Sequence, residues 1–352
     1  MLFESLDTPS VLVDLDVAER NLLECQRYCD EHGLRSRPHI KTHKLPFLAK
    51  AQVEAGAVGI TCQKVSEAEV MAEAGLEDIF LTFNILGPAK LARLRRLAER
   101  VKLCVSADNR TVVEGLSEAF KGAPRPLSVL VECDTGHGRC GVQSPEAAAL
   151  LAQAVERAPG LIFAGLMTYP PAGRVAEVGA WLREAIALCE EAGFHCAVVS
   201  NGGTPDLWRA HELADVVTEH RPGTYIYNDR SLVARGFCGP DDCALTVLAT
   251  VVSTPTDRRA IIDAGSKTLT SDLFGLQGHG LILGHGDVAV AGLSEEHGHL
   301  ESAQAHRLTV GERLRIVPNH ACVVSNMVDR VELIRGEETV RSEPVAARGT
   351  IL

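Results

Sequence analysis

Residues 58–105 read VGITCQKVSEAEVMAEAGLEDIFLTFNILGPAKLARLRRLAERVKLCV, and this stretch decides the fold class. It holds three short apolar, β-branched runs, at 58–62, 79–82 and 102–105. Alanine- and leucine-rich amphipathic stretches separate these runs. Such alternation is typical of parallel strands joined by crossover helices, so we predict an α/β fold.

The same pattern continues on both sides of this stretch and gives eight runs in all. They are residues 36–40, 58–62, 79–82, 102–105, 128–132, 163–167, 196–200 and 215–218. Eight strands with helices between them favour a closed (β/α)8 TIM barrel. An open doubly wound sheet is the alternative, and the number of runs favours the barrel.

The pattern changes near residue 236, where the long helices end. The remaining runs are β-like and separated by turns, at 244–252, 259–263, 281–282, 288–291, 313–318 and 327–334. We expect a barrel domain over residues 1–235 and a mostly antiparallel β domain over 236–352. Residues 8–14 read as a strand before the first helix, so residues 1–15 could pair with the β domain instead of the barrel.

Composition excludes several classes of protein. The chain has 46 acidic and 35 basic residues, a net charge of −11, which disfavours binding to nucleic acid or to an anionic membrane. Only 4% of the residues are aromatic, which argues against a platform that stacks bases. We therefore expect a small-molecule substrate and no nucleic-acid or membrane partner.

The sequence also carries expectations about location. The start lacks the features of a signal peptide, and no run of about 18 apolar residues is present. The 11 cysteines are an odd number and are scattered along the chain without a CxxC pair. We therefore expect free thiols and a cytoplasmic protein.

The first predicted strand ends in a basic segment, RPHIKTHK at residues 37–44. Strand alternation places Arg37, His39 and Lys41 on one side. In a barrel, function gathers at the carboxyl ends of the strands. Desolvation and cationic neighbours there would lower the pKa of a lysine and make it a nucleophile suited to a Schiff base. The alternative is a basic surface loop.

Glycine-rich loops follow three later strands. ECDTGHGRCG at 132–141 follows the fifth, with Arg139 as a fixed cation. Residues 200–204, SNGGT, follow the seventh, and residues 221–225, RPGTY, follow the eighth. Barrels often bind phosphate with loops at these last two positions. A lysine and a phosphate cradle in one barrel mouth indicate pyridoxal 5′-phosphate (PLP) as the cofactor. The alternative is that the glycines serve only to form tight turns.

The β domain contains His320-Ala321-Cys322. If this segment is a strand, both side chains lie on one face, within reach of one metal ion. Imidazole and thiolate suit Zn²⁺, and two protein ligands would leave room for water and substrate. The alternative is a buried cysteine beside a partly exposed histidine.

At these motifs the chain resembles the metal-activated, fold-type III PLP enzymes that include D-threonine aldolase, 3-hydroxy-D-aspartate aldolase and D-serine dehydratase. The resemblance covers nearly the whole chain, including QKVSE at 63–67, GRCGV at 138–142 and the motifs above. It implies an alanine-racemase-like barrel, a D-serine-dehydratase-like β domain and a homodimer.

The resemblance also implies roles for individual residues. Lys41, and not Lys44, would carry PLP, with His39, Arg139 and Tyr169 as further catalytic residues. The residues implied to hold the cofactor are Lys41, Gln63, Arg139, Tyr169, Ser200, Gly202, Gly203, Thr204, Gly223, Thr224 and Tyr225. His320 and Cys322 would bind a divalent metal (Zn, Mn or Mg) near the β-hydroxyl of the substrate.

The chain departs from the aldolases of this family in two places. They usually present His-x-Asp as the metal pair, whereas His320-x-Cys322 matches the dehydratases. Threonine-type aldolases also carry a histidine a few residues beyond the tyrosine, but PPAGR follows Tyr169. Arg174 stands near the place of that histidine. It is either a solvated residue or a partner for a second carboxylate on the substrate.

We expect a lyase that acts on β-hydroxy-D-amino acids of the D-threonine or 3-hydroxy-D-aspartate type. Retro-aldol cleavage to glycine and an aldehyde is favoured by the likeness of the middle segments. Dehydration to a keto acid and ammonia is favoured by His-x-Cys. A non-catalytic PLP-binding protein is an alternative of another class, and the large β domain argues against it. Racemisation would need a second base opposite Lys41, which the sequence does not identify.

Overall fold

The computed structural model describes residues 2–352, and its chain divides into two compact units. One unit comprises residues 24–41, 46–223 and 350–352 and is called the barrel unit here. The other comprises residues 1–23, 42–45 and 224–349 and is called the β unit. None of the helices within residues 2–352 is long and apolar enough to cross a membrane.

The barrel unit contains eight parallel strands in the order β2-β9-β8-β7-β6-β5-β4-β3. A parallel bridge between His39 and Thr61 joins the two ends of this order, and Thr61 N donates to Pro38 O at 2.8 Å. The (β/α)8 prediction is thus confirmed. The strands are β2 (Arg35–Ser36), β3 (Ile60–Cys62), β4 (Asp78–Leu81), β5 (Lys102–Ala107), β6 (Leu127–Cys133), β7 (Leu161–Thr168), β8 (Val198–Asn201) and β9 (Glu219–His220).

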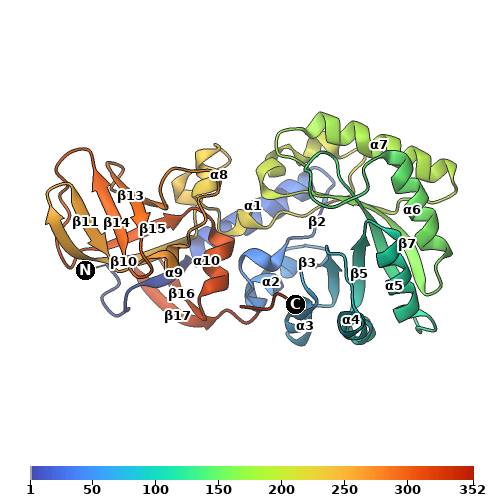
Figure 1. The fold of residues 1–352 in the computed structure, drawn as a ribbon, viewed down its shortest axis with the longest axis horizontal. Helices are drawn as coiled ribbons and strands as arrows, with labels where there is room; N and C mark the ends of the chain where they lie inside the picture. Colours follow the sequence, from blue (N-terminus) through green and yellow to red (C-terminus); the bar gives the residue numbers. More distant parts are fainter. Residues whose placement is uncertain (1) are drawn as a thin grey trace. The chain divides into compact units, whose positions relative to one another are not determined.

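Amphipathic helices cover the outside of these strands, and Figure 1 shows α4 to α7 around them. Helix α6 (Pro145–Arg157) illustrates why they form. Ser144 caps its first turn by accepting from Ala147 N at 3.2 Å, and its buried residues recur at helical spacing. The other long helices are α1 (Leu15–Glu31), α2 (Pro46–Glu54), α3 (Val65–Glu73), α4 (Pro88–Arg100), α5 (Arg110–Phe120) and α7 (Val175–Glu191).

The eighth strand of the barrel, β9, comprises Glu219–His220 and so begins directly after the predicted run at residues 215–218. Val216 and Val217 are buried, but their backbone N–H groups bond to Leu213 O in a turn after the 3-10 segment η2 (Thr204–Leu213). The strand itself is Glu219–His220, whose polar side chains hid it from a search for apolar runs.

The β unit is a mostly antiparallel sheet, also as predicted. Its main path is β13-β14-β11-β10-β1-β16-β17, and β15 pairs with β10 and β12. The bounds are β1 (Ser10–Asp14), β10 (Leu245–Thr256), β11 (Arg259–Ile262), β12 (Gly280–Ile282), β13 (Val288–Leu293), β14 (Gly298–Ser302), β15 (Arg313–Pro318), β16 (Arg330–Arg335) and β17 (Glu338–Pro344). Short helices α8 (Arg230–Ala234), α9 (Ser266–Leu269) and α10 (Ala321–Met327) accompany them.

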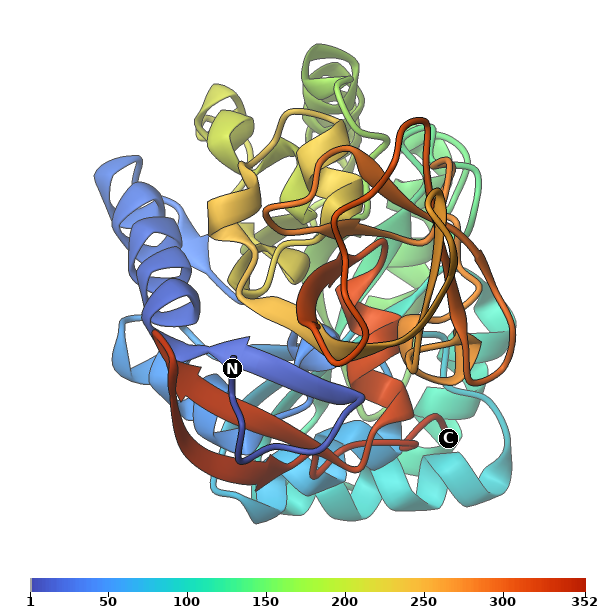
Figure 2. The same cartoon turned by 90° about the vertical axis from the view of Figure 1, so that its left-hand side faces the viewer.

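The N-terminal strand β1 belongs to this sheet. It pairs antiparallel with β10 and parallel with β16, and Figure 2 shows it beside the C-terminal strands. Leu12 is fully buried in a cluster with Phe3, Leu248 and Ile334. The first strand of the chain therefore joins two strands that come more than 200 residues later.

Candidate active site

Tyr169, the residue after β7, has a ring that three side chains of the barrel unit approach. Lys41 Nζ lies 5.9 Å from its centroid, and Arg139 Cζ lies 4.9 Å from it. The His137 ring meets it edge-on at a centroid distance of 4.9 Å. The structure thus brings together three residues singled out from the sequence. It adds His137, which was not singled out because a contact between the loops after β6 and β7 leaves no local signal.

A chain of hydrogen bonds fixes the backbone of Lys41. The Lys41 N–H donates to His39 Nδ1 at 3.3 Å, so His39 Nε2 carries the proton and donates to Gln63 Oε1 at 3.1 Å. Gln63 Nε2 then donates to Thr82 O at 2.9 Å. His39 and Gln63 therefore hold the lysine segment in place from the ends of β3 and β4.

The glycine-rich loops after β8 and β9 form a cradle beside Tyr169. A Cβ on Gly203 would lie 3.0 Å from Tyr169 Cε2, and one on Gly202, whose φ is +130°, would lie 2.8 Å from Arg221 N. Gly223 N donates to Thr204 Oγ1 at 3.3 Å and ties the two loops together. A primary amine, an aromatic ring and a cradle that only glycine permits are a set that fits PLP.

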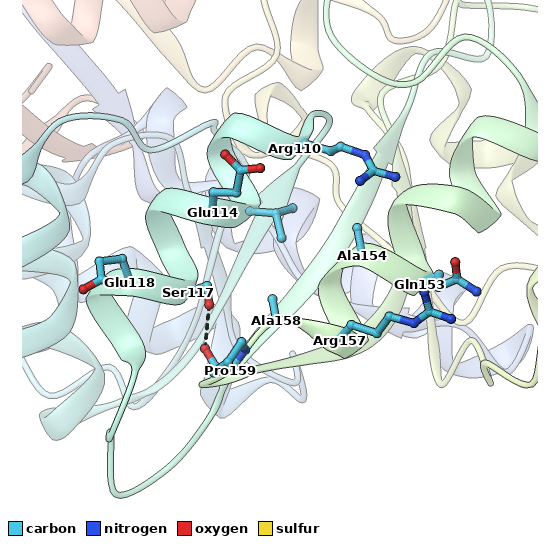
Figure 3. Close-up of a pocket in the computed structure, with 10 residues that line it drawn as sticks. Arg110, Glu114, Ser117, Glu118, Gln153, Ala154, Arg157, Ala158 and Pro159 are labelled. Carbon is cyan, nitrogen blue, oxygen red and sulfur yellow. Dashed lines mark hydrogen bonds between the residues drawn. The ribbon is translucent and has the colours of Figure 1, made fainter.

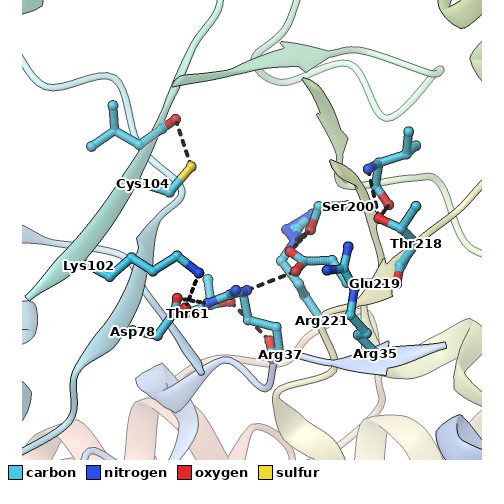
Figure 4. Close-up of polar contacts among 12 residues, drawn as sticks. Arg35, Arg37, Thr61, Asp78, Lys102, Cys104, Ser200, Thr218, Glu219 and Arg221 are labelled. Carbon is cyan, nitrogen blue, oxygen red and sulfur yellow. Dashed lines mark hydrogen bonds and ion pairs between the residues drawn. The ribbon is translucent and has the colours of Figure 1, made fainter. Parts of the chain in front are cut away.

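Ser200 lies in a buried polar network inside the barrel (Figure 4). Its Oγ donates to Glu219 Oε1 at 2.6 Å and accepts from Arg221 Nε at 2.9 Å. Glu219 also pairs with Arg37 Nε at 2.9 Å, and Arg37 Nη1 reaches Asp78 at 2.6 Å. The Ser200 hydroxyl is thus engaged by side chains of the barrel interior.

Arg221 is a buried cation that the sequence analysis did not assign to the site. It is 5% exposed, and its Nη2 donates to Thr168 O at 2.5 Å, at the end of β7. Burial lowers its pKa to about 10, while the carboxylates Glu219 and Glu132 oppose that shift. It brings positive charge to the strand end next to Tyr169.

Two residues predicted to hold the cofactor belong to the β unit. Thr224 Oγ1 lies 3.7 Å from Cys322 Sγ, and Tyr225 is buried at 4% exposure. Thr42, which follows Lys41 in the chain, places its Oγ1 3.2 Å from the same sulfur. The hydroxyls of both threonines therefore lie around the cysteine.

The predicted metal pair is close in space, but not for the reason given. His320 and Cys322 do not share a strand: His320 is the extended N-cap of α10, and Cys322 lies in the first turn of that helix. The prediction of a strand was wrong because Pro318 ends β15 and the ACVVSNM segment continues as helix. The His320 and Cys322 side chains nevertheless lie close enough for each to shift the pKa of the other.

Each group of this pair stabilises the charged form of the other. Burial alone would lower the pKa of His320, but the hydrogen bond and charge of Cys322, with Asp272, raise it to about 9. Burial alone would raise the pKa of Cys322, and His320 and Thr42 lower it instead. An imidazole beside a thiol that readily loses its proton fits a soft divalent metal such as Zn²⁺. Within residues 2–352, no group of three or more histidine, cysteine or acidic side chains could hold a metal.

Arg174 is the N-cap residue of α7, which begins at Val175. Its Nε pairs with Glu177 at 3.3 Å, and the two side chains are 55% and 57% exposed. Its Nη1 would lie 3.4 Å from a Cβ on Gly136, in the loop that carries His137 and Arg139. The role in substrate choice stays a prediction.

A groove on the outside of the barrel unit lies apart from these groups. Helices α5 and α6 form its walls, with Arg110, Glu114, Ser117 and Arg157 among its lining residues (Figure 3). It contains none of the predicted site residues.

Comparison with protein-family models gives two matches. Residues 13–231 match the alanine racemase N-terminal domain, and residues 244–334 match a putative serine dehydratase domain. The first match alone covers more than half of the chain.

Three curated relatives match along almost their whole length. D-threonine aldolase from Arthrobacter sp. is 36% identical, covering 98% of this chain and 93% of the relative. 3-Hydroxy-D-aspartate aldolase from Paracoccus denitrificans (strain Pd 1222) is 34% identical, covering 98% and 92%. D-threo-3-hydroxyaspartate dehydratase from Delftia sp. (strain HT23) is 32% identical, covering 96% and 97%.

Solved structures give the same grouping. D-threonine aldolase from Filomicrobium marinum superposes with a TM-score of 0.92 at 34% identity, over 100% of this chain and 99% of that one. A variant of D-threo-3-hydroxyaspartate dehydratase in the metal-free form gives a TM-score of 0.88 at 30% identity, over 98% of each chain. The chain therefore belongs to the alanine-racemase-like, fold-type III family of PLP-dependent lyases, whose members include these aldolases and the dehydratase.

Proposed function

We propose that the protein is a PLP- and divalent-metal-dependent lyase that cleaves β-hydroxy-D-amino acids by a retro-aldol reaction. D-threonine would give glycine and acetaldehyde, and 3-hydroxy-D-aspartate would give glycine and glyoxylate. The observation that carries the proposal is the full-length likeness to two aldolases, at 36% and 34% identity. The group of basic residues around Tyr169 supports it.

Residues of the barrel unit have separate roles in binding the cofactor. Lys41 holds the cofactor, whose ring system, when bound, accepts the electron pair released as Cα–Cβ breaks. Gly203, Thr204 and Gly223 hold its phosphate through backbone N–H groups and a hydroxyl. Tyr169 and Arg139 position its ring region.

The retro-aldol route needs a base for the β-hydroxyl proton, and we assign this task to His137. Burial and the charge of Arg139 lower the pKa of His137, so its ring is neutral at physiological pH and can accept a proton. The His137 and Tyr169 rings lie 4.9 Å apart, centroid to centroid. His137 thus supplies an imidazole beside Tyr169, whereas the PPAGR segment after Tyr169 contains no histidine.

His320 and Cys322 are proposed to hold the metal, and the thiol favours Zn²⁺ over Mn²⁺ or Mg²⁺. A divalent ion near a β-hydroxyl acidifies it and also makes it a better leaving group. The second candidate function is therefore dehydration to a keto acid and ammonia. The His-x-Cys pair and the 32% identity to a dehydratase favour it.

Product analysis separates the two reactions. The holoenzyme is incubated with D-threonine, 3-hydroxy-D-aspartate and D-serine, each with Zn²⁺ or Mn²⁺. Glycine and aldehyde in equal amounts support the aldolase, whereas ammonia and a keto acid support the dehydratase. No turnover of any D-amino acid would favour a PLP-binding protein without catalysis.

Arg174 is proposed to select substrates that carry a second carboxylate. A well-formed arginine–carboxylate pair is worth about 1.5–3 kcal/mol, or roughly ten- to a hundred-fold in kcat/KM. Arg174→Ala should lower kcat/KM for 3-hydroxy-D-aspartate and leave D-threonine unchanged. Arg183→Ala removes a similarly exposed arginine, paired with Asp215, and serves as the matched control. Equal losses on both substrates would contradict the role.

Two further expectations come from the resemblance and from the sequence. We propose a homodimer, which light scattering of the purified protein would test against a mass of 37.7 kDa for one chain. A cytoplasmic location also stays a prediction, which fractionation of cells that produce the protein would test.

A further inference from the structure

The segment from Thr270 to Gly278 carries a carboxylate that faces the proposed metal ligand His320. Asp272 Oδ2 lies 2.7 Å from His320 Nδ1. Asp272 Oδ1 accepts from Phe274 N at 3.1 Å, which orients the carboxylate within its own turn. The Phe274 ring lies against the imidazole at a centroid distance of 4.6 Å. His320 is therefore held both at its edge and on its face.

The residue before His320 anchors the same segment. Asn319 is 1% exposed, and its Nδ2 donates to Gly278 O at 2.8 Å and to Asp272 O at 3.3 Å. Its Oδ1 accepts from Arg230 Nη1 at 3.0 Å. A buried amide with all these bonds made fixes the backbone of the segment to the start of α10.

Asp229, the other nearby carboxylate, already has a structural task. Its Oδ1 accepts from Ser231 N at 3.1 Å and from Ser231 Oγ at 2.6 Å, which caps α8. Its Oδ2 accepts from Ala321 N at 3.1 Å. Asp272 is thus the carboxylate whose Oδ2 bonds to the ring of His320, while its Oδ1 is held by Phe274 N.

The chemistry of a metal-binding histidine explains that bond. A ligand imidazole is neutral and offers a lone pair on one ring nitrogen, while the other nitrogen carries a proton. Donation of that proton to a carboxylate fixes the tautomer and the ring orientation and makes the ligand more basic. Asp272 accepts from Nδ1, which leaves Nε2 for the metal.

We propose that Asp272 is a positioning residue that holds His320 in the tautomer and orientation for binding metal through Nε2. The inference rests on the metal site of the proposed function and deepens it. It assigns to the site a residue 48 positions away in the chain, in a segment without a recognisable motif.

Metal affinity, measured apart from turnover, tests this role. The full-length holoenzyme is treated with a chelator and titrated with Co²⁺, whose bond to the Cys322 thiolate gives a near-ultraviolet absorption band. Asp272→Ala and Asp272→Asn should weaken Co²⁺ binding by about 10- to 100-fold. Asp272→Glu should restore part of the affinity. Asp287→Asn, at an exposed turn of the same unit, is the matched control and should bind like the wild type.

Stability measurements distinguish positioning from general support of the fold. In the metal-free state, Asp272→Asn and the wild type should unfold at similar temperatures. Unchanged Co²⁺ affinity in Asp272→Ala would overturn the proposal, as would a loss that Asp272→Glu does not reverse at all. A wild type that binds Co²⁺ through Cys322 but cleaves no β-hydroxy-D-amino acid would overturn the proposed function and leave the role of Asp272 standing.

Discussion

Lys41 and Lys44 are three residues apart and have different surroundings. Lys41 Nζ lies over Tyr169, whereas Lys44 Nζ donates to Asn326 Oδ1 at 2.8 Å within the β unit. Lys41→Ala should abolish the visible absorbance of bound cofactor and its reduction by borohydride. Lys44→Met, the control, should keep both. The reverse result would move the cofactor to Lys44.

Gly203 is the residue on which the cradle beside Tyr169 depends most directly. A Cβ there would lie 3.0 Å from Tyr169 Cε2, so Gly203→Ala must displace the ring that Lys41 and Arg139 contact. We expect the dissociation constant of PLP to rise by about tenfold, or about 1.4 kcal/mol. Gly286→Ala, where nothing lies within 4 Å of the added carbon, is the control. Equal PLP affinity in both variants would contradict the cradle.

His220 should make stability depend on pH. Burial, followed by the charge of Arg221, lowers its pKa from 6.5 to about 4. Between these values the unfolded chain binds a proton that the folded chain does not, so stability is lost as pH falls. The loss between pH 7.5 and 5 is about 2 kcal/mol in the free energy of unfolding. In urea unfolding at pH 7.5 and pH 5, the free energy of unfolding of His220→Gln should fall by about 2 kcal/mol less than that of the wild type. An equal fall in both proteins would exclude His220 as the cause of the pH dependence.

The sequence singled out candidate site residues where a motif follows a predicted strand, as at Lys41, Arg139 and Gly203. It did not single out His137, Arg221 or Asp272, which the structure places beside candidate residues. Their roles depend on partners in other loops: Tyr169 for His137, Thr168 for Arg221 and His320 for Asp272. Such pairings come from tertiary packing, which spacing along a chain does not reveal.

At the level of elements, apolar runs predicted most strands but not the polar ones. Strand β14 and the mostly exposed strand β17 carry too few apolar residues to form a run. The segment at residues 320–322 was predicted as a strand, but α10 begins at Ala321. Its helix begins directly after β15 and the short His320 linker, and short apolar segments do not distinguish the two states.

Strand β1 should be among the elements most sensitive to core substitution. Leu12 is fully buried against Phe3, Leu248 and Ile334, on a strand hydrogen-bonded along both edges. Leu12→Ala should lower the free energy of unfolding by about 2–5 kcal/mol. Leu23→Ala, 59% exposed on α1, should change it by less than about 0.5 kcal/mol. Chemical denaturation of both variants tests this, and similar losses would contradict the central place of β1.

At the level of the whole molecule, the lysine proposed to carry the cofactor and the two proposed metal ligands belong to different units. Lys41 and Tyr169 lie in the barrel unit, whereas His320 and Cys322 lie in the β unit. EDTA should therefore suppress turnover of β-hydroxy substrates while the visible absorbance of bound PLP remains. Added Zn²⁺ should restore activity. Loss of PLP together with the metal would show that the two sites depend on each other for binding.

The pairing of β1 has a consequence for synthesis on the ribosome. Its partners β10 and β16 end at residues 256 and 335, so both edges of β1 stay unpaired while the barrel is translated. At about 5–20 residues per second, Ile334 follows Asp14 by roughly 16–64 seconds. Until β10 has been made, the apolar strand SVLVD has no native partner at either edge, and the edge that pairs with β16 stays open until residues 332–334 follow. The barrel strands can meet as they emerge, whereas the β sheet can close only after nearly the whole chain has been made.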